Sequence, residues 1–241
     1  MQRAAFFDID GTLYRDSLMI EHFKKLIRYE VIDPALWHSH VKHTYADWQR
    51  RIGEYEDYME ELAAIYIEAL TGKDLISLDF INDQVIALKG DQVYSFTRKR
   101  IKWHQDRGHK VFFISGSPDY LVSKMAMKYG VSDYKGTDYL LDENGKFTGE
   151  VIPNWDAENK TRTINRFAEK YNIDFTRSYA YGDTNGDISM LRRVGHPVAI
   201  NPTRELLENI KKDPVLRETA TIIVERKDVV YQLSADVETV K

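Results

Sequence analysis

Short apolar runs without alternating polar positions recur along this chain, at residues 4–7, 111–114, 178–181, 197–200 and 221–224. Such runs are typical of strands buried on both faces, as in a parallel sheet covered by helices. Each run leads into a polar segment; in order these are Asp8, Ser115, Gly182-Asp183, Asn201-Pro202 and Glu225. Because ligands bind beyond the carboxyl ends of the strands in such sheets, the pattern predicts a reactive edge there.

Helical spacing of apolar residues fills the intervals between the predicted strands. Ser117-Pro118 suits the N-cap and first turn of a helix that Gly130 is placed to end, and its apolar face would be Leu121, Val122, Met125 and Tyr129. A second helix is expected after Lys160, with its apolar face at Ile164, Phe167, Ala168 and Tyr171. The alternation predicts an α/β fold with a doubly wound, Rossmann-like parallel sheet. Asn144-Gly145 predicts a hairpin turn within it.

Residues 14–90 have a different character, with helical periodicity and no convincing strand. The spacing is closest at Tyr55, Tyr58, Met59, Leu62, Tyr66 and Ala69. Asp33-Pro34 and Gly53 are the expected helix boundaries. We therefore predict that 14–90 form an inserted α-helical bundle that caps a core domain made of 1–13 and 91–241. Residues 226–241 give no prediction.

The composition excludes several classes of partner and site but does not identify a function. The 241 residues include 34 basic and 38 acidic ones, a formal net charge of -4, so no nucleic-acid or anionic membrane partner is expected. The absence of cysteine excludes thiolate nucleophiles and Cys-ligated zinc. No signal-peptide pattern opens the chain and no apolar run approaches the roughly 20 residues of a membrane helix, so a cytoplasmic location is expected.

Carboxylates mark two of the predicted strand ends. Asp8 and Asp10 lie two apart, which on a strand would put both side chains on one side, close enough to share a metal ion. Asp183 and Asp187 follow a second run. Turn formation alone would also favour Asp and Gly at these places, and a lysine such as Lys160 is most often a solvated side chain. The combination of the four carboxylates favours metal binding.

Four separated motifs occur in order: Asp8-Ile9-Asp10-Gly11-Thr12, then Ser115, then Lys160, then Gly182-Asp183-Thr184-Asn185-Gly186-Asp187. Together they resemble the haloacid dehalogenase superfamily of phosphohydrolases. Within it they resemble the phosphoserine-phosphatase-like branch, which carries a helical cap after the first strand. The resemblance covers roughly residues 4–202 and implies a magnesium-dependent phosphatase that acts on a small phosphorylated metabolite.

The resemblance also implies roles for individual residues. Asp8 would be the nucleophile that forms an aspartyl-phosphate, and Asp10 the general acid and base. Magnesium, which prefers oxygen ligands, would be held by Asp8, Asp183 and the backbone carbonyl of Asp10, with Asp187 supporting the site. Ser115 and the backbone of Gly116 would bind the phosphoryl oxygens. Lys160 would neutralise charge on Asp8 and on the phosphoryl group.

Departures from the family pattern leave the substrate open. Phosphoserine phosphatases carry a Glu nine residues after the nucleophile, where this chain has Ser17 beside Asp16. Gly116-Ser117-Pro118 replaces the usual glycine pair after the serine, and Gly186 replaces an Asn. The alternatives are a phosphoserine phosphatase, a phosphotransferase with the same intermediate, and, less expected, a non-catalytic phosphate-binding regulator. Halide displacement is disfavoured because dehalogenases lack the second Asp, which is Asp10 here.

Overall fold

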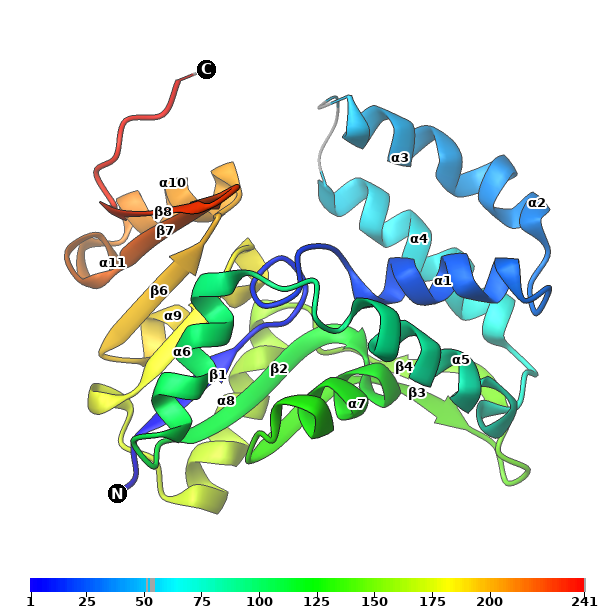
Figure 1. The fold of residues 1–241 in the computed structure, drawn as a ribbon, viewed down its shortest axis with the longest axis horizontal. Helices are drawn as coiled ribbons and strands as arrows, with labels where there is room; N and C mark the ends of the chain where they lie inside the picture. The colour runs from blue at the N-terminus through cyan, green and yellow to red at the C-terminus, as the bar shows by residue number, and fades with distance from the viewer. Residues whose placement is uncertain (51, 53–54, 241) are drawn as a thin grey trace.

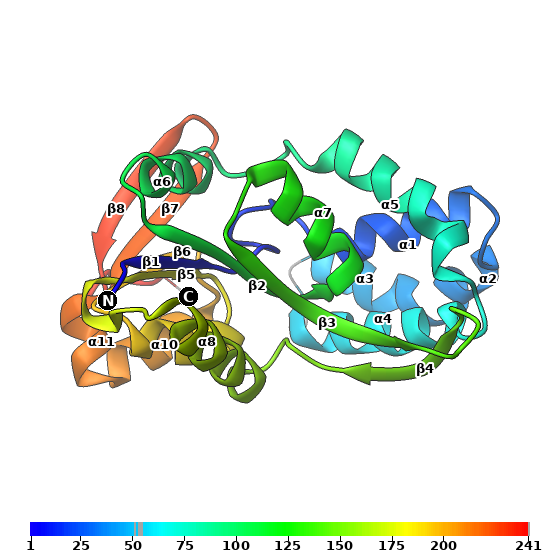
Figure 2. The ribbon, with the colours of Figure 1, turned by 90° about the horizontal axis from the view of Figure 1, so that it is seen from below.

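An eight-stranded sheet runs through the molecule, with strand order β4-β3-β2-β1-β5-β6-β7-β8 (Figures 1 and 2). The computed structural model describes residues 1–50, 52 and 55–240. The strands are β1 (Ala4–Phe7), β2 (Lys110–Pro118), β3 (Asp133–Leu141), β4 (Phe147–Ile152), β5 (Tyr179–Gly182), β6 (His196–Ile200), β7 (Thr221–Arg226) and β8 (Val229–Ser234). The inner pairs are parallel, whereas β4 and β8 pair antiparallel with their neighbours and form the two edges.

Helices cover both faces of this sheet and form a separate group at one end (Figures 1 and 2). That group comprises α1 (Leu18–Arg28), α2 (Pro34–Leu36), η1 (Trp37–Val41), α3 (Lys42–Gln49), α4 (Tyr55–Leu70) and α5 (Leu75–Lys89). The helices against the sheet and in its loops are α6 (Ser95–Gln105), α7 (Asp119–Tyr129), α8 (Ala157–Tyr171), η2 (Phe175–Arg177), η3 (Asn185–Asp187), α9 (Ile188–Arg193), α10 (Arg204–Lys212) and α11 (Pro214–Thr219). The predicted α/β class with a Rossmann-like sheet is confirmed.

The absence of alternation in the apolar runs has a direct structural cause. Successive side chains of a strand point to opposite faces, and both faces are covered. Phe6 belongs to the cluster formed with α8, α9, α10 and α11, whereas its neighbour Phe7 belongs to the cluster formed with α6 and α7. Both rings are fully buried. Every residue of β1 is therefore a core residue, as expected for a central strand.

The helical group has its own apolar core, which contains Phe23, Tyr58, Leu62 and Tyr66. Helix α5 joins this core to the sheet, because Leu78 lies in the helical cluster while Val85 packs with the sheet. The predicted boundary at Asp33-Pro34 is present: the Asp33 carboxylate accepts a hydrogen bond from the backbone of Ala35 at 2.8 Å. The predicted boundary at Gly53 lies outside the described residues.

The prediction of Ser117 as a helix N-cap is wrong. Strand β2 continues to Pro118, and α7 begins only at Asp119. The Ser117 hydroxyl instead donates to Asp10, which lies far away in the sequence, and the Ser117 N–H donates to the Ser115 hydroxyl at 3.1 Å. Gly130 does end α7, with a left-handed φ of 60°.

Two features at the edges of the sheet were not anticipated from the sequence: the pairing of β3 with β2, and strand β8. The hairpin predicted around Asn144-Gly145 is present between β3 and β4, but β3 also pairs in parallel with β2 and so belongs to the main sheet. Residues 229–234 form β8, the second edge. Across the described part of the chain, no helix has the length and apolar character needed to cross a membrane.

Replacement of Phe112 tests the packing of the sheet. Its ring stacks between Phe6 and Phe167, with centroid distances of 5.2 Å and 4.9 Å. Phe112→Ala should lower the free energy of unfolding by about 3–5 kcal/mol, measured by urea denaturation. Val215→Ala, at a position that is 66% exposed, should change it by about 0.5 kcal/mol at most. Equal effects of the two substitutions would contradict this account of the core.

Candidate functional site

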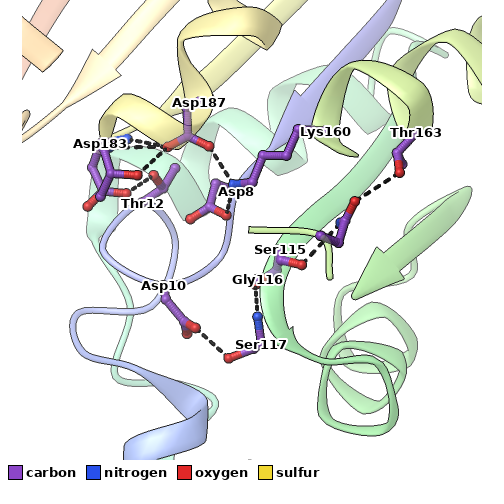
Figure 3. A network of polar contacts seen from close by, with 12 residues as sticks. Asp8, Asp10, Thr12, Ser115, Gly116, Ser117, Lys160, Thr163, Asp183 and Asp187 are labelled. Atoms are coloured by element: carbon purple, nitrogen blue, oxygen red, sulfur yellow. Dashed lines mark hydrogen bonds and ion pairs between the residues drawn. The ribbon is translucent and has the colours of Figure 1, made fainter. Parts of the chain in front are cut away.

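The carboxyl ends of β1, β2 and β5 bring the predicted site residues together (Figure 3). Asp8 follows β1, Ser115 lies in β2, and Asp183 follows β5. Lys160 comes from the first turn of α8, which begins after the N-cap Asp156. All four side chains are buried; Asp183, the most accessible, is 9% exposed. The sheet edge predicted from the apolar runs is the place where they meet.

The ammonium group of Lys160 lies between two carboxylates. Its Nζ is 2.7 Å from Asp8 Oδ1 and 2.6 Å from Asp187 Oδ1. Burial opposes the charge on Lys160, but the Asp187 and Asp8 carboxylates outweigh it and raise the pKa of the ammonium group. Lys160 is therefore charged at neutral pH, and it holds Asp8 in a fixed position.

Asp187 organises the loop that follows β5. Its Oδ2 accepts hydrogen bonds from the backbone N–H groups of Asp183 at 3.0 Å and Thr184 at 3.2 Å. Gly182 allows this approach, since a Cβ there would lie 2.4 Å from the Asp187 Cβ. Because both Asp187 oxygens already have partners, Asp8 and Asp183 are the better candidates for metal ligands.

The Asp183 carboxylate faces the loop after β1. Thr12 Oγ1 donates to Asp183 Oδ1 at 2.7 Å. Gly11, with φ of 76°, passes so close that a Cβ built on it would lie 2.0 Å from Asp183 Oδ2. Burial, followed by the charges of Asp8 and Asp187, raises the pKa of Asp183 well above its usual range.

Asp10 lies apart from this carboxylate cluster (Figure 3). Strand β1 ends at Phe7, so the alternation rule for strands does not apply to Asp8 and Asp10, and the two side chains bind different partners. Asp10 Oδ1 accepts from the N–H of Leu18 at 2.9 Å, and Oδ2 accepts from the Ser117 hydroxyl. Burial raises the pKa of Asp10 to about 6, against the lowering effect of these hydrogen bonds.

Ser115 and Gly116 are fixed by residues that the motifs did not indicate. Asn154 Nδ2 donates to the Ser115 carbonyl at 3.1 Å, and Asn154 Oδ1 accepts from the Thr163 hydroxyl at 2.9 Å. Gly116 has backbone close to Trp155, whose Cβ would lie 2.8 Å from a Cβ at position 116. Asn154 stands just before the helix that carries Lys160, and nothing in its sequence context signals this contact.

The charge balance of the site fits a divalent cation. One carboxylate oxygen of each of Asp8, Asp183 and Asp187 lies within 4.8 Å of the other two. Burial and the neighbouring carboxylates also act on Asp8, whose pKa is raised despite the opposing effect of Lys160. A cation bound between these oxygens would relieve that repulsion, and hard oxygen ligands suit Mg²⁺.

Comparison with known proteins agrees with this site. The haloacid dehalogenase-like hydrolase family matches residues 5–192. The chain is 24% identical over 223 residues to a histidinol-phosphatase of Neisseria meningitidis, covering 90% of this chain and 99% of that protein. It is 27% identical over 207 residues to a phosphoserine phosphatase of Mycobacterium tuberculosis, covering 84% of this chain and 66% of that protein.

A solved structure shares the fold. The aspartyl-phosphate intermediate analogue of a phosphoserine phosphatase superposes with a TM-score of 0.60 at 20% identity, covering 94% of this chain and 95% of that one. The chain belongs to the haloacid dehalogenase-like hydrolase family. The predicted superfamily, its phosphoserine-phosphatase-like branch and the enzyme class are thereby confirmed.

Gly11→Ala tests whether the close approach of Gly11 positions Asp183. We expect Mg²⁺ to raise the melting temperature of the wild-type protein if Asp183 is a ligand, and the added Cβ, which would displace the Asp183 carboxylate, should abolish that rise. Gly145→Ala is a matched control, because Gly145 has φ of 77° and nothing within 4 Å of the added Cβ. Both variants carry a similar backbone strain of about 1–2 kcal/mol. The same response to Mg²⁺ in both would count against Asp183 as a ligand.

Proposed function

We propose that this protein is a magnesium-dependent phosphatase that hydrolyses a small organic phosphomonoester through an aspartyl-phosphate on Asp8. The observation that carries the proposal is the buried Lys160, which holds Asp8 at 2.7 Å beside the Asp183 and Asp187 carboxylates. A carboxylate nucleophile divides a slow hydrolysis into two easier steps. The phosphatase names of the relatives support the same chemistry.

In the first step, an Asp8 oxygen attacks phosphorus and the ester oxygen leaves. A bound Mg²⁺, held by Asp8, Asp183 and the backbone carbonyl of Asp10, would supply positive charge against the phosphoryl oxygens. Lys160 adds a second positive charge next to Asp8. The Ser115 hydroxyl and the Gly116 N–H would donate hydrogen bonds to the phosphoryl group, which orients it for attack.

Asp10 would transfer protons in both steps. Its raised pKa, about 6, leaves about a tenth of the Asp10 groups protonated at pH 7, far more than at the ordinary Asp pKa, and the protonated form can protonate the leaving alcohol. Once ionised, Asp10 would remove a proton from the water that hydrolyses the Asp8 phosphoester. Its two hydrogen bonds, from Leu18 and Ser117, fix the carboxyl group for this role.

The helical group would select the substrate. We propose that residues 14–90 act as a cap domain over a core made of 1–13 and 91–241, with the cap covering the leaving group. Ser17 occupies the position where phosphoserine phosphatases carry a Glu, and it is buried. This difference favours a small phosphorylated metabolite other than phosphoserine. Histidinol phosphate and phosphoserine are the first compounds to compare, given the names of the relatives.

Asp8→Asn should abolish turnover, at least about 1,000-fold, because it removes the nucleophile and one cation ligand with little change of shape. Phosphate release would be measured from a panel of metabolite phosphates and p-nitrophenyl phosphate, with Mg²⁺ or with a chelator. Added alcohol would reveal a phosphotransferase by its phosphorylated product. Retained Mg²⁺-dependent release in a folded Asp8→Asn variant would refute the assignment.

Asp10→Asn should slow the release of alkyl alcohols by about 100-fold or more, the usual contribution of a general acid. The first step with p-nitrophenyl phosphate should be affected much less, because this leaving group departs without a proton. Burst kinetics on both substrates would separate the two steps. An equal loss on both substrates at the first step would argue against Asp10 as the acid.

A further inference from the structure

A carboxylate outside the family match holds together the two segments that connect the helical group to the sheet. Glu225 lies in β7, beyond the matched residues 5–192, and its side chain is 3% exposed. Its Oε1 accepts from the N–H of Ser95 at 2.9 Å and its Oε2 from the N–H of Phe96 at 2.8 Å. Oε1 also lies 3.1 Å from the Arg15 guanidinium.

These contacts come from both linkers. Arg15 belongs to the segment that enters α1, whereas Ser95 and Phe96 begin α6, directly after the segment that leaves α5. The linkers also pair with each other: the Tyr94 N–H donates to the Leu13 carbonyl at 2.9 Å, and Arg15 Nε donates to the Val93 carbonyl at 3.1 Å. We call these two paired linkers, around residues 13–15 and 93–94, the neck. Glu225 therefore fixes the neck where it joins the core.

The electrostatics favour a strong interaction between the Glu225 carboxylate and the N-terminus of α6. The first turn of α6 presents unpaired N–H groups and the positive end of the helix dipole, and both are complemented by a carboxylate. A buried carboxylate that has lost a partner is strongly unfavourable, so Glu225 and its partners stabilise one arrangement of the neck. Arg15 is half exposed and contributes the weaker part of the interaction.

The neck is in contact with the metal-binding side of the site. The Thr97 hydroxyl in α6 donates to the Thr12 carbonyl at 2.8 Å, and the Thr12 hydroxyl donates to Asp183. On the other side, the Glu225 N–H donates to Asn201 Oδ1 at 2.9 Å, close to the loop where the Thr203 N–H donates to the Asp183 carbonyl. These hydrogen bonds attach the neck to the core near the loop that carries Asp183.

Asp8, Ser115 and Lys160 are at most 5% exposed in this arrangement of the helical group and the core, which we call closed because it leaves an ester little access to them. We propose that Glu225 is a positioning residue that holds the neck in the closed arrangement, so that it sets how readily the cap closes on substrate. This proposal rests on the proposed phosphatase function. Loss of the Glu225 contacts would favour open forms and weaken substrate capture, while the groups that perform the chemistry stay in place.

Hydrogen exchange and steady-state kinetics of Glu225→Gln test the proposal. Gln has nearly the same shape, but its amide group cannot accept from both Ser95 and Phe96 at the two observed positions. Exchange of the amides in residues 92–97 should accelerate about tenfold or more, with the central strands unchanged. KM for the best ester of the panel should rise about fivefold or more while kcat changes less than about twofold.

The matched control removes another ion pair between the helical group and the core. Asp79 in α5 lies 2.7 Å from Lys124 in α7 and is 61% exposed. Asp79→Asn should leave both the linker exchange and KM unchanged. Should Glu225→Gln fail to fold, Arg15→Met loosens the same neck from its exposed side and should shift linker exchange and KM in the same direction, by less.

The outcomes separate the two hypotheses. If hydrogen exchange of the amides in residues 92–97 is unchanged in a folded Glu225→Gln variant, the proposal that Glu225 holds the neck is wrong, whatever the activity. A fall in kcat with KM unchanged overturns it as well, because that result indicates damage to the chemistry. If the wild-type protein releases phosphate from no ester, the proposed function fails, and the exchange experiment still decides whether Glu225 holds the neck.

Discussion

The ion pairs of Lys160 are the interaction on which the site depends. Three buried carboxylates, Asp8, Asp183 and Asp187, gather at one end of the sheet, and burial makes negative charge costly there. Lys160 neutralises part of that charge from α8, and its ammonium group joins the loop after β1 to the loop after β5. Removal of one partner from a buried pair typically costs about 3–5 kcal/mol, so this contact also fixes α8 against the sheet.

Close backbone packing also determines the shape of the site. Gly11, Gly116 and Gly182 each leave less than 3 Å for a Cβ against a neighbouring site residue or its support. At each of these positions the backbone can therefore approach its neighbour more closely than a residue with a Cβ would allow. The result is a site whose shape is set by backbone contacts and whose charge is set by Lys160. A divalent cation added to it would find oxygen ligands already oriented, which is the condition for tight binding at low reorganisation cost.

The sequence predicted those features that depend on local pattern. The apolar run 4–7 is strand β1, and the face of Leu121, Val122 and Met125 is buried in α7. Features that depend on distant partners were missed. Ser is a residue type that favours the N-cap position, but the Ser117 hydroxyl donates instead to Asp10, which lies more than a hundred residues away in the sequence. Strand β8 begins with the apolar residues Val229, Val230 and Tyr231, but these side chains are exposed and pair only with the edge of the sheet, so the short run alone did not identify a strand. Asn154 supports Ser115 only because the fold brings β2 and α8 together.

The division between core and helical group explains why the chemistry is easier to infer than the substrate. Groups assigned to the phosphoryl group all come from the strands, loops and α8 of the core. The junction with the helical group is built differently: His22 in α1 contacts the Tyr66 hydroxyl, which lies 2.6 Å from the Tyr120 hydroxyl in α7. Burial lowers the pKa of His22 to about 3, so this particular contact is neutral and is formed by hydrogen bonds between His22 and the two tyrosine side chains. A leaving group that met this surface would be selected by its shape and hydrogen bonding, whereas its phosphate would be held by the charges of the core. On the proposed function, relatives named histidinol-phosphatase and phosphoserine phosphatase could share one core, because discrimination between leaving groups would be made at a surface that takes no part in the phosphoryl transfer.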